Sequence, residues 1–336
     1  MKDKPLVSII IPNYNYEKTI KVCLDSVIRQ TYKNIEIVFV DDGSTDKSVE
    51  IASKYPCKII KSKINKGASA VRNLGADNSS GDILFFLDSD VALFEDAIEN
   101  TVIAFKNDDS LGSVCGIYAK EPLYNDSLVE EYRILQGHYW RISSEGYVTP
   151  AFVSLGAIRR DVFYEIGKFN EKIEGASVED LEIGFRINVN YKLLLTTKVQ
   201  GYHDDEYKLG LLCKKIFERA RLRIPFYAQR KKMSKGFETP SRAMGMMFAG
   251  FSTVLLPASF LSIYFIFLAI ASIFLFILFD IGQYIFVFKE KGLSFLLYFI
   301  GVHWVVTVVS FYGLVKGVME FCLSKKFRNR YKLLDT

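Results

Sequence analysis

Two carboxylates separated by one residue, Asp88 and Asp90, are the first side chains in this sequence that could do chemistry. They follow the apolar run 83–87, which is typical of a buried strand. Carboxylates two residues apart across a turn can share a hard cation, such as Mg²⁺ or Mn²⁺, with the oxygens of a diphosphate. Aspartates also shape turns at strand ends, so the pair indicates a metal site only together with other signals.

Two further acidic pairs lie at element boundaries. Asp41 and Asp42 end a β-branched run and precede a Gly-Ser turn, where a carboxylate could accept a hydrogen bond from a nucleobase or simply form the turn. Glu179 and Asp180 open a segment with a helical pattern. A carboxylate there could act as a general base, kept ionised by the helix dipole, or could serve only as a cap.

An arginine and a histidine complete the candidate set. Arg72 lies in a helix expected over 67–77, where it could contact a nucleotide or pair with a neighbouring acid. His203 ends a strand-like segment and precedes three acids. It could be a metal ligand, although a single histidine usually is not one.

The elements that position these residues alternate between strand and helix patterns. The alternation predicts an α/β domain with a mainly parallel sheet, which binds ligands beyond the carboxyl ends of its strands. The polar turns 12–15, 41–44 and 88–90 are therefore expected along one rim. Strands are expected at 6–11, 35–40, 58–60 and 83–87, and helices at 17–30, 47–54 and 67–77.

The order and spacing of the motifs make the chain similar to a known family over about residues 5–225. It resembles the inverting, GT-A-fold glycosyltransferases of family 2. The donor half of that family is matched by 7–15, 40–46, 65–73 and 87–90, and the acceptor half by 155–160, 166–169 and Glu179-Asp180.

The resemblance implies a role for each matching position. Nucleotide-sugar contacts are implied for Pro12, Tyr14, Asp41, Asp42, Arg72, Asp88 and Ser89. The metal, Mg²⁺ or Mn²⁺, is implied to bind Asp90, with Asp88 and His203 as further ligands. Asp180 is implied as the catalytic base with Glu179 beside it, and Gly156 and Ala157 as small residues of the sugar and acceptor pocket.

The implied activity is inverting transfer of a single sugar to a hydroxyl group of a lipid-linked or glycan acceptor. A UDP-sugar donor is favoured and a GDP-sugar is possible. Polyprenyl-phosphate sugar synthases are an alternative, but their ionised phosphate acceptor needs no base, so Glu179-Asp180 favours a hydroxyl acceptor. A non-catalytic nucleotide-sugar-binding scaffold is a second alternative, although Asp90 and Asp180 are both present.

Two other enzyme classes fit the sequence less well. Processive polysaccharide synthases carry a Q/RxxRW motif, and the arginine-bearing segment 219–225 has no tryptophan. Nucleotidyltransferases need a glycine-rich basic loop after the first strand, and residues 12–15 do not form one. We therefore expect single-sugar transfer.

Two uncharged stretches, 243–279 and 292–315, predict a membrane domain. Each exceeds the roughly 20 residues that cross a bilayer. Pro257 should interrupt the first stretch, which gives an interfacial helix at 243–256 and spans at 258–279 and 293–315. We thus expect a catalytic domain over 1–240, with a donor half to about 115, an acceptor half over 116–225 and a basic interfacial segment over 211–242. The membrane domain is expected over 243–336, with a basic tail.

The basic residues predict the orientation. Residues 208–242 hold eleven Lys or Arg against two acids, and residues 325–332 hold five with no acid. Both flanks should lie on the cytoplasmic side, which puts the catalytic domain and the C-terminus at the cytoplasmic face of the cell membrane. The net charge of +5 then indicates attraction to membrane lipids. No zinc-finger or RNA-binding signature indicates a nucleic acid partner.

Overall fold

The computed structural model describes residues 3–149, 154–173, 178–230 and 239–331. These residues form two compact units. The sheet unit comprises residues up to 125 and 140–205, and the helical unit comprises 126–139 and nearly all the described residues from 206 onward.

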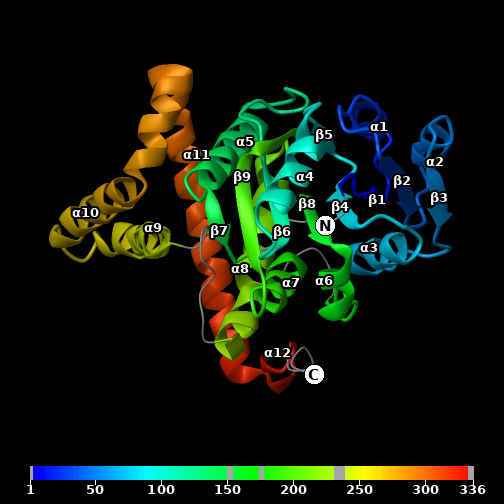
Figure 1. Cartoon of the computed structure of the whole chain (residues 1–336). Coiled ribbons are helices and arrows are strands. Elements are labelled where there is room, and N and C mark those ends of the chain that lie inside the picture. Colours follow the sequence, from blue (N-terminus) through cyan, green and yellow to red (C-terminus); the bar gives the residue numbers. More distant parts are fainter. Residues whose placement is uncertain (1–2, 150–153, 174–177, 231–238, 332–336) are drawn as a thin grey trace. The chain divides into compact units, whose positions relative to one another are not determined.

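The sheet unit is built on a nine-stranded mixed sheet (Figure 1). Its order is β3-β2-β1-β4-β8-β6-β9-β5, with β7 paired to β9. The strands are β1 Val7–Asn13, β2 Ile35–Asp41, β3 Lys58–Lys61, β4 Ile83–Leu87, β5 Val91–Leu93, β6 Leu111–Tyr118, β7 Gly146–Val148, β8 Leu155–Arg159 and β9 Lys192–His203.

The predicted mainly parallel sheet is present, since β6 also pairs with β9 in parallel, but three strands run in the opposite direction. Strands β3, β2, β1 and β4 run parallel, as their β-branched, buried sequences indicate. β8 runs antiparallel to both β4 and β6, while β5 and β7 run antiparallel to β9. Residue periodicity identifies a strand but not its direction, which depends on the path of the connecting segment.

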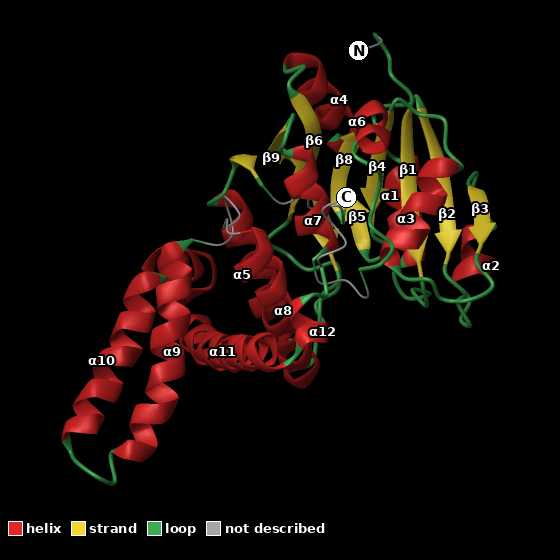
Figure 2. Ribbon diagram, turned by 90° about the horizontal axis from the view of Figure 1, so that it is seen from below, coloured by secondary structure: helices red, strands yellow, loops and turns green. Residues whose placement is uncertain are grey.

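Helices cover both faces of this sheet (Figure 2). α1 and α4 pack on the face that carries Ile9 and Phe85. α3 and α6 pack on the opposite face, where Gly75 of α3 lies against Ile10 and Phe163 of α6 lies 5.6 Å from Phe86, centroid to centroid. The helices of this unit are α1 Ile20–Ile28, α2 Ser48–Ala52, α3 Ala68–Asp77, α4 Ala97–Asn107, α6 Arg160–Glu165 and α7 Glu179–Ile187.

The helical unit contains long helices that follow the basic segment of the chain. α8 and α11 pack closely because Gly313 and Gly317 of α11 face backbone carbonyls of α8. The helices are α8 Leu209–Arg230, α9 Pro240–Ala258, α10 Tyr264–Phe279, α11 Ile281–Leu323 and α12 Lys325–Arg328, and most of α5 Leu128–Ile142 also belongs here. The sequence pattern did not predict the helix α5.

The apolar stretches form these helices with boundaries that differ from the predicted ones. α9 ends one residue after Pro257, and the 16-residue α10 begins at Tyr264. Residues 281–291, expected as a loop, are helical, and α11 is broken at Gly292, whose φ is 75°. Among the described residues, α11 is the one helix long and apolar enough to cross a membrane.

Gly75 provides a test of how α3 is held on the sheet. A Cβ at this position would overlap Ile10 Cγ2 and would lie 3.1 Å from Val40 Cγ2. Overpacking costs about 1–3 kcal/mol, against a gain in helix propensity of about 1 kcal/mol. We predict that Gly75→Ala lowers the melting temperature by a few degrees in thermal unfolding. Gly210 of α8 is the control, because no atom lies within 4 Å of a Cβ added there. Gly210→Ala should therefore not lower the melting temperature. Equal melting temperatures of the two variants would contradict this packing.

Candidate active site

The carboxyl ends of β1, β2 and β4 meet at one edge of the sheet. Asn13 pairs with Asp41 in register, and its Nδ2 donates to Asp41 Oδ1 at 3.3 Å and to Ser44 Oγ at 3.0 Å. Ser89 Oγ donates to the Pro12 carbonyl at 2.8 Å, which ties the β4 turn to β1. The prediction that the three polar turns share one rim is confirmed.

The two aspartates after β2 are buried and brace neighbouring loops. Asp42 accepts hydrogen bonds from the backbone N–H groups of Lys66 and Gly67 at 2.8 and 2.9 Å. Asp41 Oδ2 accepts from Ser44 N at 3.2 Å. Tyr14, by contrast, is 46% exposed beside them. Tyr14 thus offers an exposed aromatic surface to a nucleotide. The two aspartates hold the loops of the rim in place.

Arg72 of α3 is almost completely buried and bridges two acids. Its Nη2 donates to Asp88 Oδ1 at 2.8 Å, and its Nη1 lies 3.6 Å from Glu179 Oε1. Burial alone would lower the pKa of the guanidinium, but the charges of Asp88, Glu179 and Asp180 outweigh burial and raise that pKa above its ordinary value. Arg72 therefore forms the salt bridge that the sequence allowed, and its predicted nucleotide contact stays a prediction.

The next residue, Asn73, makes a second link to the same part of the fold. Its Nδ2 donates to the Phe169 carbonyl and to Glu171 Oε1, both at 2.9 Å, and its Oδ1 accepts from Phe169 N at 3.0 Å. Sequence reasoning noticed Asn73 only as part of a motif. The sequence carries no signal for this link, because the burial of Arg72 and Asn73 appears only in the structure.

Asp90 and His203 come together because β5 begins directly after Asp90. Val91 pairs with His203 in the β5–β9 ladder, and Asp204 N donates to the Asp90 carbonyl at 3.0 Å. His203 Nε2 then lies 3.7 Å from Asp90 Oδ1. Two ligands of one ion, each about 2.1 Å from it, lie roughly 3–4 Å apart. The donor set of carboxylate and imidazole and its spacing therefore fit a divalent cation.

Asp88 stands between the predicted metal site and Arg72. Its side chain is 30% exposed, and one carboxylate oxygen is taken by the guanidinium. Cys23 lies beneath this turn, where its Sγ donates to the Asp88 carbonyl at 3.8 Å. Burial raises the pKa of the Cys23 thiol, and the charges of Asp90 and Asp88 raise it further. The thiol thus supports the turn from beneath through its contact with the Asp88 carbonyl.

Glu179 and Asp180 begin α7, as the sequence pattern predicted. Residues 174–177, immediately before, lie outside the described residues. The two acids differ in environment. Glu179 is buried against Arg72, whereas Asp180 is partly exposed and its Oδ1 accepts a hydrogen bond from Leu181 N at 2.8 Å. Asp180 is therefore the acid of the pair that an external hydroxyl can approach.

Gly156 and Ala157, predicted to lie in the sugar and acceptor pocket, are buried in the sheet. Both are interior residues of β8, with Gly156 hydrogen-bonded between β4 and β6. Ala157 is fully buried in the apolar core. Their burial places neither side chain on the exposed surface of the rim.

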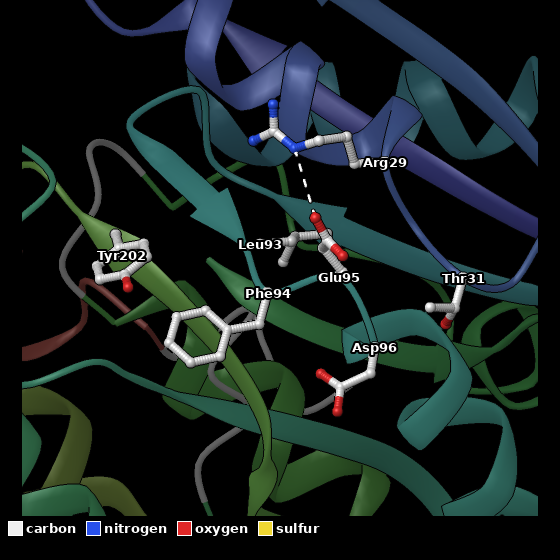
Figure 3. A pocket seen from close by; sticks show the side chains of 7 residues that line it. All are labelled: Arg29, Thr31, Leu93, Phe94, Glu95, Asp96 and Tyr202. Atoms are coloured by element: carbon white, nitrogen blue, oxygen red, sulfur yellow. Dashed lines mark ion pairs between the residues drawn. The ribbon is translucent and has the colours of Figure 1, made fainter.

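A shallow hollow lies on the sheet unit away from these residues (Figure 3). The Phe94 and Tyr202 rings, 5.0 Å apart, form one side, and Arg29 Nε lies 3.9 Å from Glu95 Oε1 on the other. None of the predicted site residues lines it. The candidate site is therefore the rim and not this hollow.

Comparison with known proteins gives a consistent result. The model of Glycosyl transferase family 2 matches residues 8–167. Glycosyltransferase GlyA of Streptococcus pneumoniae is 38% identical over 125 residues, which cover 35% of this chain and 18% of GlyA. EpsH of Bacillus subtilis, also named a glycosyltransferase, is 30% identical over 234 residues, which cover 62% of this chain and 67% of EpsH. The chain thus spans less than a fifth of GlyA.

A solved structure shares the fold. The mannosyltransferase PcManGT from Pyrobaculum calidifontis, solved in complex with GDP-Man and Mn²⁺, matches with a TM-score of 0.58 over 96% of this chain and 88% of that chain. Its sequence identity to this chain is 17%. The likeness confirms the predicted α/β GT-A fold.

The buried position of Arg72 leads to a stability prediction. Removing one partner of a buried ion pair costs about 3–5 kcal/mol, because the remaining buried charge, here that of Glu179, loses its compensation. We predict that Arg72→Met lowers the melting temperature of the protein strongly in thermal unfolding. Arg29, whose pair with Glu95 is exposed, is the matched control: Arg29→Met should change stability by less than about 1 kcal/mol. Similar melting of both variants would contradict the bridging role.

Proposed function

The chain belongs to glycosyl transferase family 2, and from that membership we propose that it transfers one sugar from a nucleotide-diphosphate sugar to an acceptor hydroxyl. The transfer inverts the configuration at the anomeric carbon. The observation that carries this proposal is the Arg72 bridge, which joins the turn of Asp88 to the start of α7. Asp88, on the donor side, is thereby linked through one guanidinium to the helix start that carries the proposed base, Asp180.

The donor binds along the rim formed by β1, β2 and β4. The exposed Tyr14 ring offers a surface on which a nucleobase can stack, next to Pro12. Asp41, Asp42 and Ser89 keep the loops around it in place through their buried hydrogen bonds. In this assignment Arg72 contributes to donor binding through Asp88 and not by direct contact.

The cation, Mg²⁺ or Mn²⁺, is held by Asp90 and His203, with Asp88 as a further ligand. When bound, it supplies positive charge next to the departing diphosphate. Without it, the rim carries several carboxylates that repel a diphosphate. The neighbour from Pyrobaculum calidifontis was solved with Mn²⁺, which is consistent with this assignment at the level of the fold.

Asp180 acts as the general base. Its partly exposed carboxylate takes the proton of the acceptor hydroxyl while the hydroxyl oxygen attacks the anomeric carbon. The bond from that carbon to the diphosphate oxygen breaks on the opposite face, so a single displacement inverts the configuration. Glu179 remains paired with Arg72 and holds the start of α7 in position. The need for a base favours a hydroxyl acceptor over an ionised polyprenyl phosphate.

The acceptor is lipid-linked or a glycan presented at the cytoplasmic face of the cell membrane. Apolar side chains of the α9–α10 region are widely exposed, with Phe260 94% and Leu261 84% accessible. Contiguous exposed apolar surface of this kind is typical of lipid or partner contact. The α9–α10 pair and α11 together embed in the bilayer, with the basic flanks on the cytoplasmic side.

The catalytic assignment predicts a specific loss in Asp180→Asn. Turnover should fall by about 10²–10⁴-fold, while nucleotide binding changes by less than about twofold because Asp180 does not hold the donor. The assay is metal-dependent release of nucleoside diphosphate from UDP-, GDP- and dTDP-sugars, with calorimetry for binding. Asp90→Ala should lose both turnover and nucleotide binding. Glu165, whose Oε2 accepts a hydrogen bond from Tyr191 Oη at 2.6 Å, is the control. Glu165→Gln should retain activity. Full turnover by Asp180→Asn would refute the assigned base.

The membrane assignment predicts that the protein stays in the pellet after alkaline carbonate extraction. A double change, Phe260→Glu with Leu261→Glu, should release a large fraction, since an acidic residue deep in a bilayer costs about 2.5–3.5 kcal/mol. Val189→Glu, at an exposed apolar residue of the sheet unit, serves as the control and should leave retention unchanged. A wild-type protein found mainly in the supernatant would contradict the assignment.

A further inference from the structure

The His203 side chain has neighbours on one ring face and at both ring nitrogens. Its ring stacks on the Tyr118 ring, with centroids 4.2 Å apart and an angle of 7° between the planes. The Arg141 guanidinium carbon lies 4.0 Å from the Tyr118 centroid. Since both groups cannot occupy the same face, Tyr118 is held between the histidine and the arginine.

The two ring nitrogens of His203 face different carboxylates. Nε2 lies 3.7 Å from Asp90 Oδ1, and Nδ1 lies 3.6 Å from Asp205 Oδ2. Both separations are slightly longer than a direct hydrogen bond. The ring therefore stands between an acid assigned to the cation and an acid that has no role in the proposed reaction.

This arrangement matters because imidazole binds a metal through one nitrogen while the other carries the proton. Histidine ligands in metalloproteins commonly donate that second N–H to a carboxylate, which sets the tautomer and the ring orientation. Here the nitrogen away from Asp90 is the one that faces Asp205.

Backbone pairing fixes His203, and an ion pair holds the acid that follows it. Leu123 N donates to the His203 carbonyl at 3.0 Å, and the β5–β9 pairing places His203 opposite Val91. Asp204 pairs with Lys18 at 3.1 Å. The next residue, Asp205, faces the histidine, with its Oδ2 3.6 Å from His203 Nδ1.

Tyr118 is itself fixed in place. Its ring is buried, and its hydroxyl lies 2.5 Å from Ser154 Oγ. Burial raises the pKa of this hydroxyl, so Tyr118 stays neutral and serves as a flat wall for the imidazole. A ring held by a wall on one face and a carboxylate at one edge has little freedom to turn.

We propose that Asp205 and Tyr118 are positioning residues that orient His203, so that its Nε2 faces the divalent-cation site shared with Asp90. The inference rests on the proposed metal-dependent function. Neither residue touches the donor or the acceptor in this scheme. Both act through the histidine, and their loss should weaken cation binding before it affects any other property.

The test is a titration of the full-length, detergent-solubilised protein with Mn²⁺, followed by electron paramagnetic resonance, alone and with UDP or GDP. Asp205→Asn should weaken Mn²⁺ binding by about 10–100-fold, the range typical for second-shell partners of metal ligands. Glu206→Gln removes a neighbouring acid that pairs with Lys215 at 3.2 Å, and it should bind Mn²⁺ like the wild type. Melting temperatures measured without metal should agree for both variants.

A second pair of variants tests the wall independently, including the case in which Asp205→Asn does not fold. Tyr118→Phe keeps the flat ring and should keep Mn²⁺ affinity within about threefold, whereas Tyr118→Leu should weaken it by about tenfold or more. Wild-type affinity in both Asp205→Asn and Tyr118→Leu would overturn the inference and leave the proposed function standing. Absence of Mn²⁺ binding by the wild type, with either nucleotide, would overturn the metal assignment itself.

Discussion

A single buried guanidinium, that of Arg72, joins the parts of this fold on which the candidate site depends. Taking a charge out of water costs several kcal/mol, which only well-placed partners can offset. Asp88 and Glu179 are those partners, and they come from different regions of the chain. The β4 turn, α3 and the start of α7 are therefore coupled electrostatically. Asn73 adds a neutral set of hydrogen bonds to the same clasp.

The balance of charge at the rim has a direct chemical consequence. Asp88, Asp90, Glu179 and Asp180 outnumber the positive charge of Arg72, so the rim is acidic. A diphosphate would be repelled there, and a divalent cation would be attracted. The metal requirement in the proposed reaction therefore follows from the electrostatics of the protein and not only from the presence of ligand atoms. The mixed sheet makes this possible, because antiparallel β5–β9 pairing returns His203 to the residue after Asp90.

The helical unit presents a different physical problem, since much of its apolar surface faces outward. Side chains of α10 such as Tyr264 and Phe267 are largely exposed. Water would penalise such a surface, whereas lipid would not. The interior of this unit combines a buried apolar cluster that includes Tyr132 and Phe299 with the close approach of α11 to α8 through Gly313 and Gly317. Arg221, paired with Glu320 at 2.8 Å, adds a polar contact between the same two helices.

The sequence by itself determined the parallel half of the sheet and the rim that it carries. Strands β1, β2 and β4 are β-branched or apolar runs that end in polar turns, and carboxyl ends of adjacent parallel strands must lie together. It also indicated that α7 starts at the acidic pair and that Asp90 could bind a cation. These features are local, so spacing and residue type are enough to predict them.

Only the tertiary structure decided which groups meet. Arg72 pairs with Asp88 and Glu179, Ala157 lies in the core, and Asp205 and Tyr118 adjoin His203. The direction of β8 and the helix α5 were also not readable from the pattern. Each of these depends on the path of a long connection and on contacts between residues far apart in the chain. Local periodicity carries no information about such contacts, whereas packing and the need to pair buried charges do.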